Sequence, residues 1–168
     1  MKLNCKIADI EDYEGIELLK KKLIDETNFF ITSSDEYKFN LDESILRNDT
    51  NNKNGGTTFV VKKDSKVVAF LFVSRSNRKK LNHIATIGMG VEPSLQNQGI
   101  GTLLLQETIR WAESNKSIRK ISLGVLSNNI KAISLYNKFG FLVEGIKVNE
   151  VKIPEKGYVD DILMYKSI

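Results

Sequence analysis

The sequence predicts an α/β protein of the mixed-sheet (α+β) kind, with a central, mostly antiparallel sheet and helices on both faces. Two segments rich in β-branched and aromatic residues, 57–63 and 67–75, are separated by a short polar break around Asp64 and Ser65. This pattern is typical of an antiparallel hairpin. Later segments alternate between strand patterning and helical periodicity, which places helices against a sheet.

The length of the chain predicts a single domain over residues 1–168. A chain of 168 residues removes roughly 70% of its unfolded surface from water, so one sizeable core is expected. Apolar residues make up 41% and charged residues 27% of the sequence, proportions that favour a globular over a disordered chain. No repeat or linker interrupts it, and the polar, glycine-ended stretch 48–56 is short enough to be a loop.

The elements of the N-terminal half follow from local patterns. Residues 3–7 alternate like a strand, and Asp9 is placed to cap the next helix. That helix has one apolar stripe, formed by Tyr13, Ile16, Leu19 and Leu23. A shorter helix is expected over 41–47, and a third long strand over 82–91, after the hairpin.

In the C-terminal half, helices and strands alternate. Residues 98–113 form two adjacent apolar rows at helical spacing, which predicts a helix packed over a broad face. A strand over 120–125 follows. A second helix is indicated by the apolar stripe Ala132, Leu135, Tyr136 and Phe139, and Gly140 can end it in the left-handed conformation. Strands over 141–148 and 158–165 complete the sheet.

Charge and composition exclude several classes of protein. A net charge of +4 is too small, and the basic residues too scattered, to indicate a nucleic-acid-binding protein. The single Cys5 and the single His83 cannot form a structural zinc site without unusual help, so no metal is expected. No segment has the roughly 18 uninterrupted apolar residues of a membrane span, and the first six residues lack the apolar core of a signal peptide. We therefore expect a cytoplasmic protein.

The most informative segment is the glycine-rich turn 91–102, which lies between a predicted strand and a predicted helix. It fits neither a nucleoside-triphosphate loop nor a dinucleotide fingerprint, because lysine does not follow the glycines and Leu104 stands where a third glycine is required. A helix that begins near Gln98 exposes free amides, and Gly99 and Gly101 let an anion approach them. The alternative is a turn that merely starts a helix.

The strand before this turn favours the ligand-binding interpretation. Alternation places Gly88 and Gly90 on one face of the strand, together with Thr86. Two neighbouring positions without side chains leave room for a ligand to lie along the strand. The sequence therefore predicts a pyrophosphate-bearing ligand whose chain follows this strand.

Two sequence blocks resemble the GNAT superfamily of acetyl-coenzyme A dependent N-acetyltransferases. The segment 96–101 is similar to the superfamily's coenzyme A signature, Gln/Arg-x-x-Gly-x-Gly/Ala, and follows a strand ending in Val-x-Pro. The segment 129–141 is similar to a second block, Asn-x-x-Ala-x-x-Leu-Tyr-x-x-x-Gly-Phe. The resemblance runs from about residue 57 to the end of the chain. It implies a GNAT-like fold, with acetyl-CoA as cosubstrate and no metal.

The resemblance also implies roles for individual residues. The pantetheine arm would pair with the strand edge at Met89, Gly90 and Val91, where an amide near Met89 can face the thioester carbonyl. Tyr136 would be a catalytic residue near the coenzyme sulfur, although its apolar stripe equally fits a core tyrosine. The remaining cofactor-binding residues are Gln96 and Asn97 in the signature, Gln98, Gly99, Ile100, Gly101 and Thr102 at the pyrophosphate, and Asn129 at the pantetheine arm.

The resulting functional prediction is an enzyme that transfers acetyl from acetyl-CoA to a primary amine by direct attack in a ternary complex. Glu26 is the candidate general base, with plain surface as its alternative, and Tyr158, Asp160 and Asp161 are expected to border the acceptor pocket. The acceptor is a small-molecule amine or a protein or peptide amine, with neither nucleic acid nor membrane as partner. An acyl-CoA binding or sensing module is the alternative function. The oligomeric state is open, a homodimer being one option.

Overall fold

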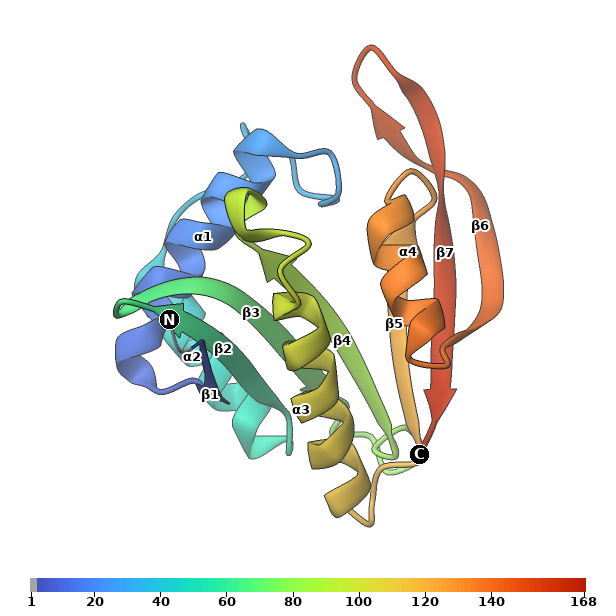
Figure 1. Ribbon diagram of the computed structural model, residues 1–168. Helices are drawn as coiled ribbons and strands as arrows, with labels where there is room; N and C mark the ends of the chain where they lie inside the picture. Colours follow the sequence, from blue (N-terminus) through green and yellow to red (C-terminus); the bar gives the residue numbers. More distant parts are fainter. Residues whose placement is uncertain (1–2) are drawn as a thin grey trace.

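The computed structural model describes residues 3–168. Its seven strands form one sheet in the order β1-β2-β3-β4-β5-β7-β6 (Figure 1). Among the described strand pairs, β4 with β5 is parallel and every other pair is antiparallel. The predicted mixed, mostly antiparallel sheet is therefore confirmed.

The N-terminal half follows the predicted order of elements. Asp9 is the predicted cap: its side chain accepts a hydrogen bond from the Glu11 amide at 3.1 Å, and its own amide donates to Asp12 at 3.1 Å. It caps a short 3₁₀ turn that runs on into the first long helix. The elements are β1 (Asn4–Ile7), η1 (Ile10–Asp12), α1 (Tyr13–Glu26), α2 (Leu41–Lys53), β2 (Thr57–Lys63), β3 (Lys66–Arg75) and β4 (Ile84–Val91).

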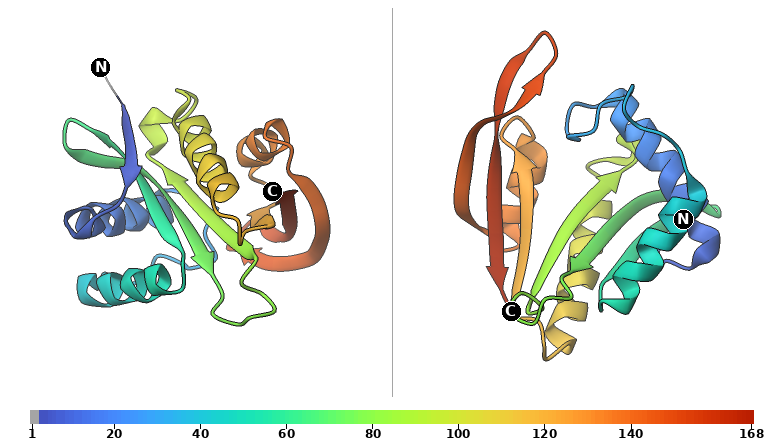
Figure 2. Two further views of the ribbon diagram at one scale, coloured as in Figure 1. Left: turned by 90° about the horizontal axis from the view of Figure 1, so that it is seen from below. Right: turned by 180° about the vertical axis from the view of Figure 1, so that it is seen from behind.

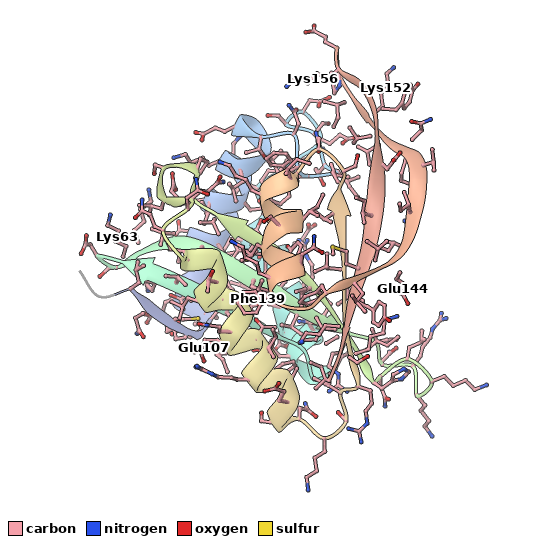
Figure 3. The ribbon with its side chains drawn as sticks, turned by 45° about the vertical axis from the view of Figure 1, so that its right-hand side comes forward. Lys63, Glu107, Phe139, Glu144, Lys152 and Lys156 are labelled. Atoms are coloured by element: carbon pink, nitrogen blue, oxygen red, sulfur yellow. The ribbon has the colours of Figure 1, made fainter. Side chains whose placement is uncertain are left out.

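The C-terminal half ends in a hairpin longer than the sequence predicts. The elements are η2 (Pro93–Leu95), α3 (Ile100–Ser114), β5 (Lys120–Leu126), α4 (Ile130–Lys138), β6 (Leu142–Ile153) and β7 (Gly157–Ser167). The polar residues after Val148 do not end the strand, because Asn149 takes a positive φ in a bulge and its amide donates to Asp160 at 2.8 Å. Lys152 and Lys156 mark the far end of this hairpin in Figure 3.

The prediction of a loop over 48–56 is wrong for most of that range, because α2 continues to Lys53. Its polar side chains find tertiary partners. The buried Asn48 donates to the Ser44 carbonyl at 2.9 Å and accepts from the Thr58 hydroxyl at 3.0 Å, while Asn51 donates to the Val73 carbonyl at 2.9 Å. The bonds to Thr58 and Val73, outside the helix, outweigh the weak helix propensity of asparagine, and only 54–56 form the turn.

The sheet separates two apolar cores, with α1 and α2 on one face and α3 and α4 on the other (Figure 2). Alternating residues of β3 supply both: Phe70 packs with α1, and its neighbours Ala69 and Leu71 pack with α3. Helices on both faces are therefore confirmed. In the described part of the chain, no helix is both long enough and apolar enough to cross a membrane.

The two glycines of β4 that share a face have different surroundings. A Cβ at Gly90 would lie 2.6 Å from Leu23 Cδ1 and 2.7 Å from Phe70 Cζ, so the α1 core already fills the space beside this glycine. A Cβ at Gly88 would meet nothing within 4 Å. The space that the sequence predicts beside this strand is thus open at Gly88 and closed at Gly90.

This difference predicts opposite effects of the same substitution on stability. Gly90→Ala should lower the free energy of unfolding by about 1–3 kcal/mol, because Leu23 and Phe70 must shift in a packed core. Gly88→Ala should leave it unchanged or raise it by up to about 1 kcal/mol, because alanine restricts the unfolded chain. Urea unfolding of both variants checks this, and equal destabilisation by the two would contradict the packing described here.

Candidate active site

Strands β4 and β5 pair over only a short stretch and then separate (Figure 1). Their parallel register runs from Ile84 opposite Lys120 to Thr86 opposite Ser122. Beyond it, 87–91 of β4 and 123–126 of β5 have no strand partner on their facing edges among the described residues, although β3 and β7 still pair with their outer edges. Two open backbone edges therefore face each other inside the sheet, and such an edge can pair with an extended ligand.

A cavity of about 1270 Å³ occupies this opening. Its walls come from the ends of β4 and β5, the turn before α3, the first turns of α3 and α4, and the segment after α1. Its lining includes every residue predicted for cofactor binding except Gln98. The side chain of Gln98 is exposed and donates to the Ser94 carbonyl at 3.4 Å. Residues from two distant sequence blocks, 89–102 and 129–136, are thus brought to one site.

The start of α3 has the properties of an anion site. The helix begins at Ile100, not at Gln98 as predicted, because Gly99 precedes it with a φ of +79° in the left-handed region. No side chain caps this end and its first turn holds no acidic residue, so the amides of Ile100, Gly101 and Thr102 are free beside the cavity. A Cβ at Gly99 would meet nothing within 4 Å, which leaves that approach open.

The structure gives Gly101 a packing role that the sequence does not predict. A Cβ there would lie 2.9 Å from Leu135 Cδ2 and 3.7 Å from the Met89 sulfur. Its missing side chain lets the first turn of α3 lie close to α4. This close approach of α3 to α4 affects the site, because Leu135 lies next to Tyr136 in the chain and both line the cavity.

Tyr136 is both a core residue and a cavity residue. It is 6% exposed and its ring packs against Phe141 at 5.7 Å between centroids, yet it lines the cavity. No described residue hydrogen-bonds to its hydroxyl, and burial raises the pKa of Tyr136 to about 12. Asn129 caps α4 as predicted, since its side chain accepts from the Ala132 amide at 3.3 Å.

On the opposite side, one carboxylate points into the cavity. Asp161 of β7 is 8% exposed, and its Oδ1 occupies the space left by Gly124, 2.8 Å from where a Cβ would be. The Lys147 ammonium lies 3.3 Å from its other oxygen. Asp160 instead accepts the bulge amide described above, and Tyr158 is largely exposed, so neither lines the cavity.

Two other groups singled out in the sequence lie elsewhere. Glu26 is at the exposed end of α1, 3.9 Å from the Lys22 ammonium and outside the cavity lining. His83, just before β4, is also outside it. Glu92, which no sequence pattern singles out, is a buried carboxylate that follows β4 and forms an ion pair with Lys22.

The segment after α1, where acceptor-site residues such as Glu26 were expected, forms one wall of the cavity through side chains to which the sequence analysis assigned no role. Phe29, Phe30 and Ile31 line it from the segment between α1 and α2. The only available signal is that three consecutive apolar residues interrupt an otherwise polar stretch. Within residues 3–168, no three His, Cys, Asp or Glu side chains come together in a way that could hold a metal ion.

Comparison with known proteins agrees with this geometry. The model of the acetyltransferase (GNAT) family matches residues 22–141. The chain belongs to this GNAT family. The matched range includes both sequence blocks of the resemblance and most of the cavity. At the level of the family, the predictions of GNAT membership and of an acyltransferase are confirmed.

Individual relatives differ in how much of the chain they cover. The L-amino acid N-acetyltransferase AaaT of Escherichia coli (strain K12) is 32% identical over 82 residues, which are 49% of this chain and 51% of AaaT. The chain thus matches about half the length of this curated relative. The GNAT-family acetyltransferase of Streptococcus pneumoniae matches 99% of this chain and 100% of its own, with a TM-score of 0.93 and 26% identity.

A more distant structure extends the likeness in fold. The yncA acetyltransferase of Salmonella typhimurium, solved with its cofactor acetyl-CoA, has a TM-score of 0.88 at 17% identity. The two chains overlap over 99% of this chain and 94% of yncA. The overall fold is therefore shared across large sequence differences.

Proposed function

We propose that this chain transfers an acetyl group from acetyl-CoA to a primary amine by direct attack in a ternary complex. One observation carries the proposal: a single cavity joins an open strand edge, a helix start without a side-chain cap, and the hydroxyl of a largely buried tyrosine that has no hydrogen-bond partner among the described residues. The extended arm of an acyl-CoA matches the strand edge, and its anionic pyrophosphate matches the helix start. The thioester sulfur, which becomes negative in the reaction, matches the tyrosine hydroxyl.

The donor side would hold acetyl-CoA mainly through backbone groups. The pantetheine arm would pair with the edge at Met89, Gly90 and Val91, as an added strand does. The pyrophosphate would lie against the amides of the α3 start, where the helix dipole favours negative charge. Asn129 would contact the arm from α4. That yncA holds acetyl-CoA within the same fold supports this assignment.

The reaction then requires one bond to form and one to break. The neutral amine nitrogen attacks the thioester carbonyl carbon, the carbonyl oxygen becomes negative, and a backbone amide near Met89 would stabilise it. The C–S bond then breaks, the amine nitrogen loses a proton, and the coenzyme thiolate gains one. The products are the acetylated amine and coenzyme A, and no covalent acyl-enzyme forms.

Tyr136 would act on the leaving sulfur by donating a hydrogen bond. With a pKa of about 12, the phenol stays protonated throughout the working range of pH. Full transfer of its proton to an alkyl thiolate, whose pKa is about 8.5, costs roughly 5 kcal/mol. A hydrogen bond that strengthens as negative charge develops on sulfur avoids this cost, and the proton itself then comes from the amine or from water.

The acceptor would enter from the α1 face, where Asp161 attracts its cationic resting form. The carboxylate oxygen beside Gly124 accepts no hydrogen bond from the described residues and is free to bind an ammonium group. The name of the AaaT relative supports a small amine such as an amino acid over a peptide or protein. Glu26 would act as base only through water, because it lies outside the cavity lining.

An acyl-CoA binding or sensing module is the alternative function. The Tyr136 hydroxyl, which has no partner among the described residues, and the unbonded oxygen of Asp161 across the cavity favour catalysis, because a module that only binds needs neither. An acetylation screen of a library of small amines, followed by release of coenzyme A thiol, tests the proposal. Tight coenzyme A binding without thiol release for any amine would establish the alternative.

The proposal also covers the oligomeric state of the protein and its location in the cell. Edge strand β6 exposes Leu142, Val143, Ile146 and Val148, which supports self-association as a homodimer. Sedimentation equilibrium measures this directly. Cell fractionation tests the proposed cytoplasmic location.

Thr102→Glu should weaken coenzyme A binding about 10-fold or more while leaving the fold intact. The new carboxylate lies in the first turn of α3, where the helix dipole tolerates it but where it repels the pyrophosphate. Gln106→Glu, on the exposed surface of the same helix, is the matched control. Calorimetry that finds equal affinity for both variants would place the anion elsewhere.

Tyr136→Phe should lower kcat by about 10- to 1000-fold, because only the hydrogen bond to the sulfur is lost. The dissociation constant of coenzyme A and the thermal midpoint should change little, since the ring remains. The shape of the pH–rate profile should also be unchanged up to about pH 10, because the phenol is neutral below its raised pKa. Wild-type kcat in this variant, with chemistry rate-limiting, would leave Tyr136 a core residue only.

Asp161→Asn should raise KM for cationic amines about 10-fold without changing KM for acetyl-CoA. The amide keeps the shape of the carboxylate and removes its charge. Asp160→Asn is the control, because the neighbouring carboxylate has the same charge but lies outside the cavity. Equal effects of the two substitutions on KM would show that only the general field of the protein matters.

A further inference from the structure

We propose that residues 27–40, the specificity wall, select acceptor amines with an apolar substituent, and that the Tyr37 hydroxyl, by bonding to buried Glu17, positions this wall together with Phe30 in the α1 core. The inference rests on the proposed acetyl transfer, because it assigns one side of the same cavity. It names Tyr37 as a positioning residue, since Tyr37 itself does not line the cavity.

The wall is apolar where it meets the cavity. Phe30 is anchored in the α1 core, whereas Ile31 is 74% exposed and Phe29 is 42% exposed, although both line the cavity. Exposed large apolar side chains at the mouth of a cavity gain free energy when a ligand covers them. An amine whose ammonium group lies at Asp161 on β7 would extend its substituent toward this wall.

The wall has little regular structure to hold it. Between the end of α1 and the start of α2 the chain forms bends and turns only. The side-chain bonds of Ser33 to Asp35 and Glu36 and of Ser34 to Asp25 are all exposed, where water competes with them. Two side chains of the segment form part-buried bonds: the Thr27 hydroxyl donates to the Leu23 carbonyl at 2.7 Å in the last turn of α1, and the Tyr37 hydroxyl donates to Glu17.

Tyr37 bonds to a carboxylate inside the protein. Glu17 of α1 is only 3% exposed, and one of its oxygens accepts from the Tyr37 hydroxyl. Its other oxygen accepts from the Ser44 hydroxyl of α2 at 2.9 Å. The Lys20 ammonium lies 4.0 Å from that second oxygen and 5.5 Å from the centre of the Tyr37 ring. A buried carboxylate thus links the wall, α1 and α2.

The two hydroxyl donors to Glu17 are equivalent in chemistry but not in position. Tyr37 belongs to the wall, whereas Ser44 belongs to α2, which does not line the cavity. A buried carboxylate that loses a donor is left underpaired, so either loss should reduce stability. Only the loss of the Tyr37 bond should release the wall.

The experiment compares two primary amines of similar size, 3-methylbutylamine and 2-methoxyethylamine. Their dissociation constants for the protein saturated with coenzyme A are measured by ligand-observed NMR. The wild type should bind the apolar amine about 10-fold more tightly. Tyr37→Phe and Ile31→Ser should each reduce this preference to about 3-fold or less. Ser44→Ala should keep the preference of the wild type while its thermal midpoint falls as that of Tyr37→Phe does.

Three results would overturn the proposal: a wild type without preference for the apolar amine, a Tyr37→Phe variant with the preference of the wild type, or equal loss of preference in Tyr37→Phe and Ser44→Ala. The last would mean that Glu17 only stabilises the fold. Thiol release from acetyl-CoA is followed with the same amines. Its absence alongside the expected binding preferences would contradict acetyl transfer and leave the specificity wall standing.

Discussion

The facing edges of β4 and β5 are where an otherwise continuous sheet stops pairing, at Thr86 and Ser122. Backbone N–H and C=O groups in the middle of a sheet normally bond to the next strand, and each one left buried without a partner costs about 1–3 kcal/mol. Such an interruption persists only when water or a ligand reaches the free edges. The cavity between the strands provides that access, and the starts of α3 and α4 converge on it. The positions of all the other site groups depend on this separation.

The two sides of the opening are built by different means. On the α3 and α4 side, the proposed recognition of the coenzyme would rest mostly on backbone: the free edge of β4 and the amides after Gly99. On the α1 side, the proposed recognition of the acceptor would rest on side chains, namely Asp161 and the apolar residues after α1. Backbone groups suit a ligand with constant chemistry, such as a coenzyme, because they do not change with mutation. Side chains suit an acceptor that differs between related proteins, because single substitutions reshape the pocket.

This division also explains what could be predicted from the sequence. A backbone site needs glycine at Gly99 and a capping asparagine at Asn129, and these leave a pattern in the sequence. The order of elements along the chain, the stripe of α4 and the proposed donor residues follow from that pattern and from periodicity, whereas the place of β7 between β5 and β6 does not. The extension of α2 does not, because Asn48 is held by contacts with Thr58 rather than by its own propensity. Nor could alternation alone decide whether Asp160 or Asp161 faces the cavity, since a shift of one residue exchanges the faces.

The acceptor side could not be predicted for a further physical reason. Its wall after α1 has no periodicity, and its position depends on a bond to Glu17, a carboxylate in the middle of a helix that local sequence marks as surface. Glu17 is tolerated in the interior only because Tyr37 and Ser44, from separate segments, both donate to it. Burial of this charge therefore requires that both segments be in place. The cost of leaving this carboxylate unpaired couples the shape of the proposed acceptor wall to the packing of α1 and α2. This coupling exists only in the folded chain.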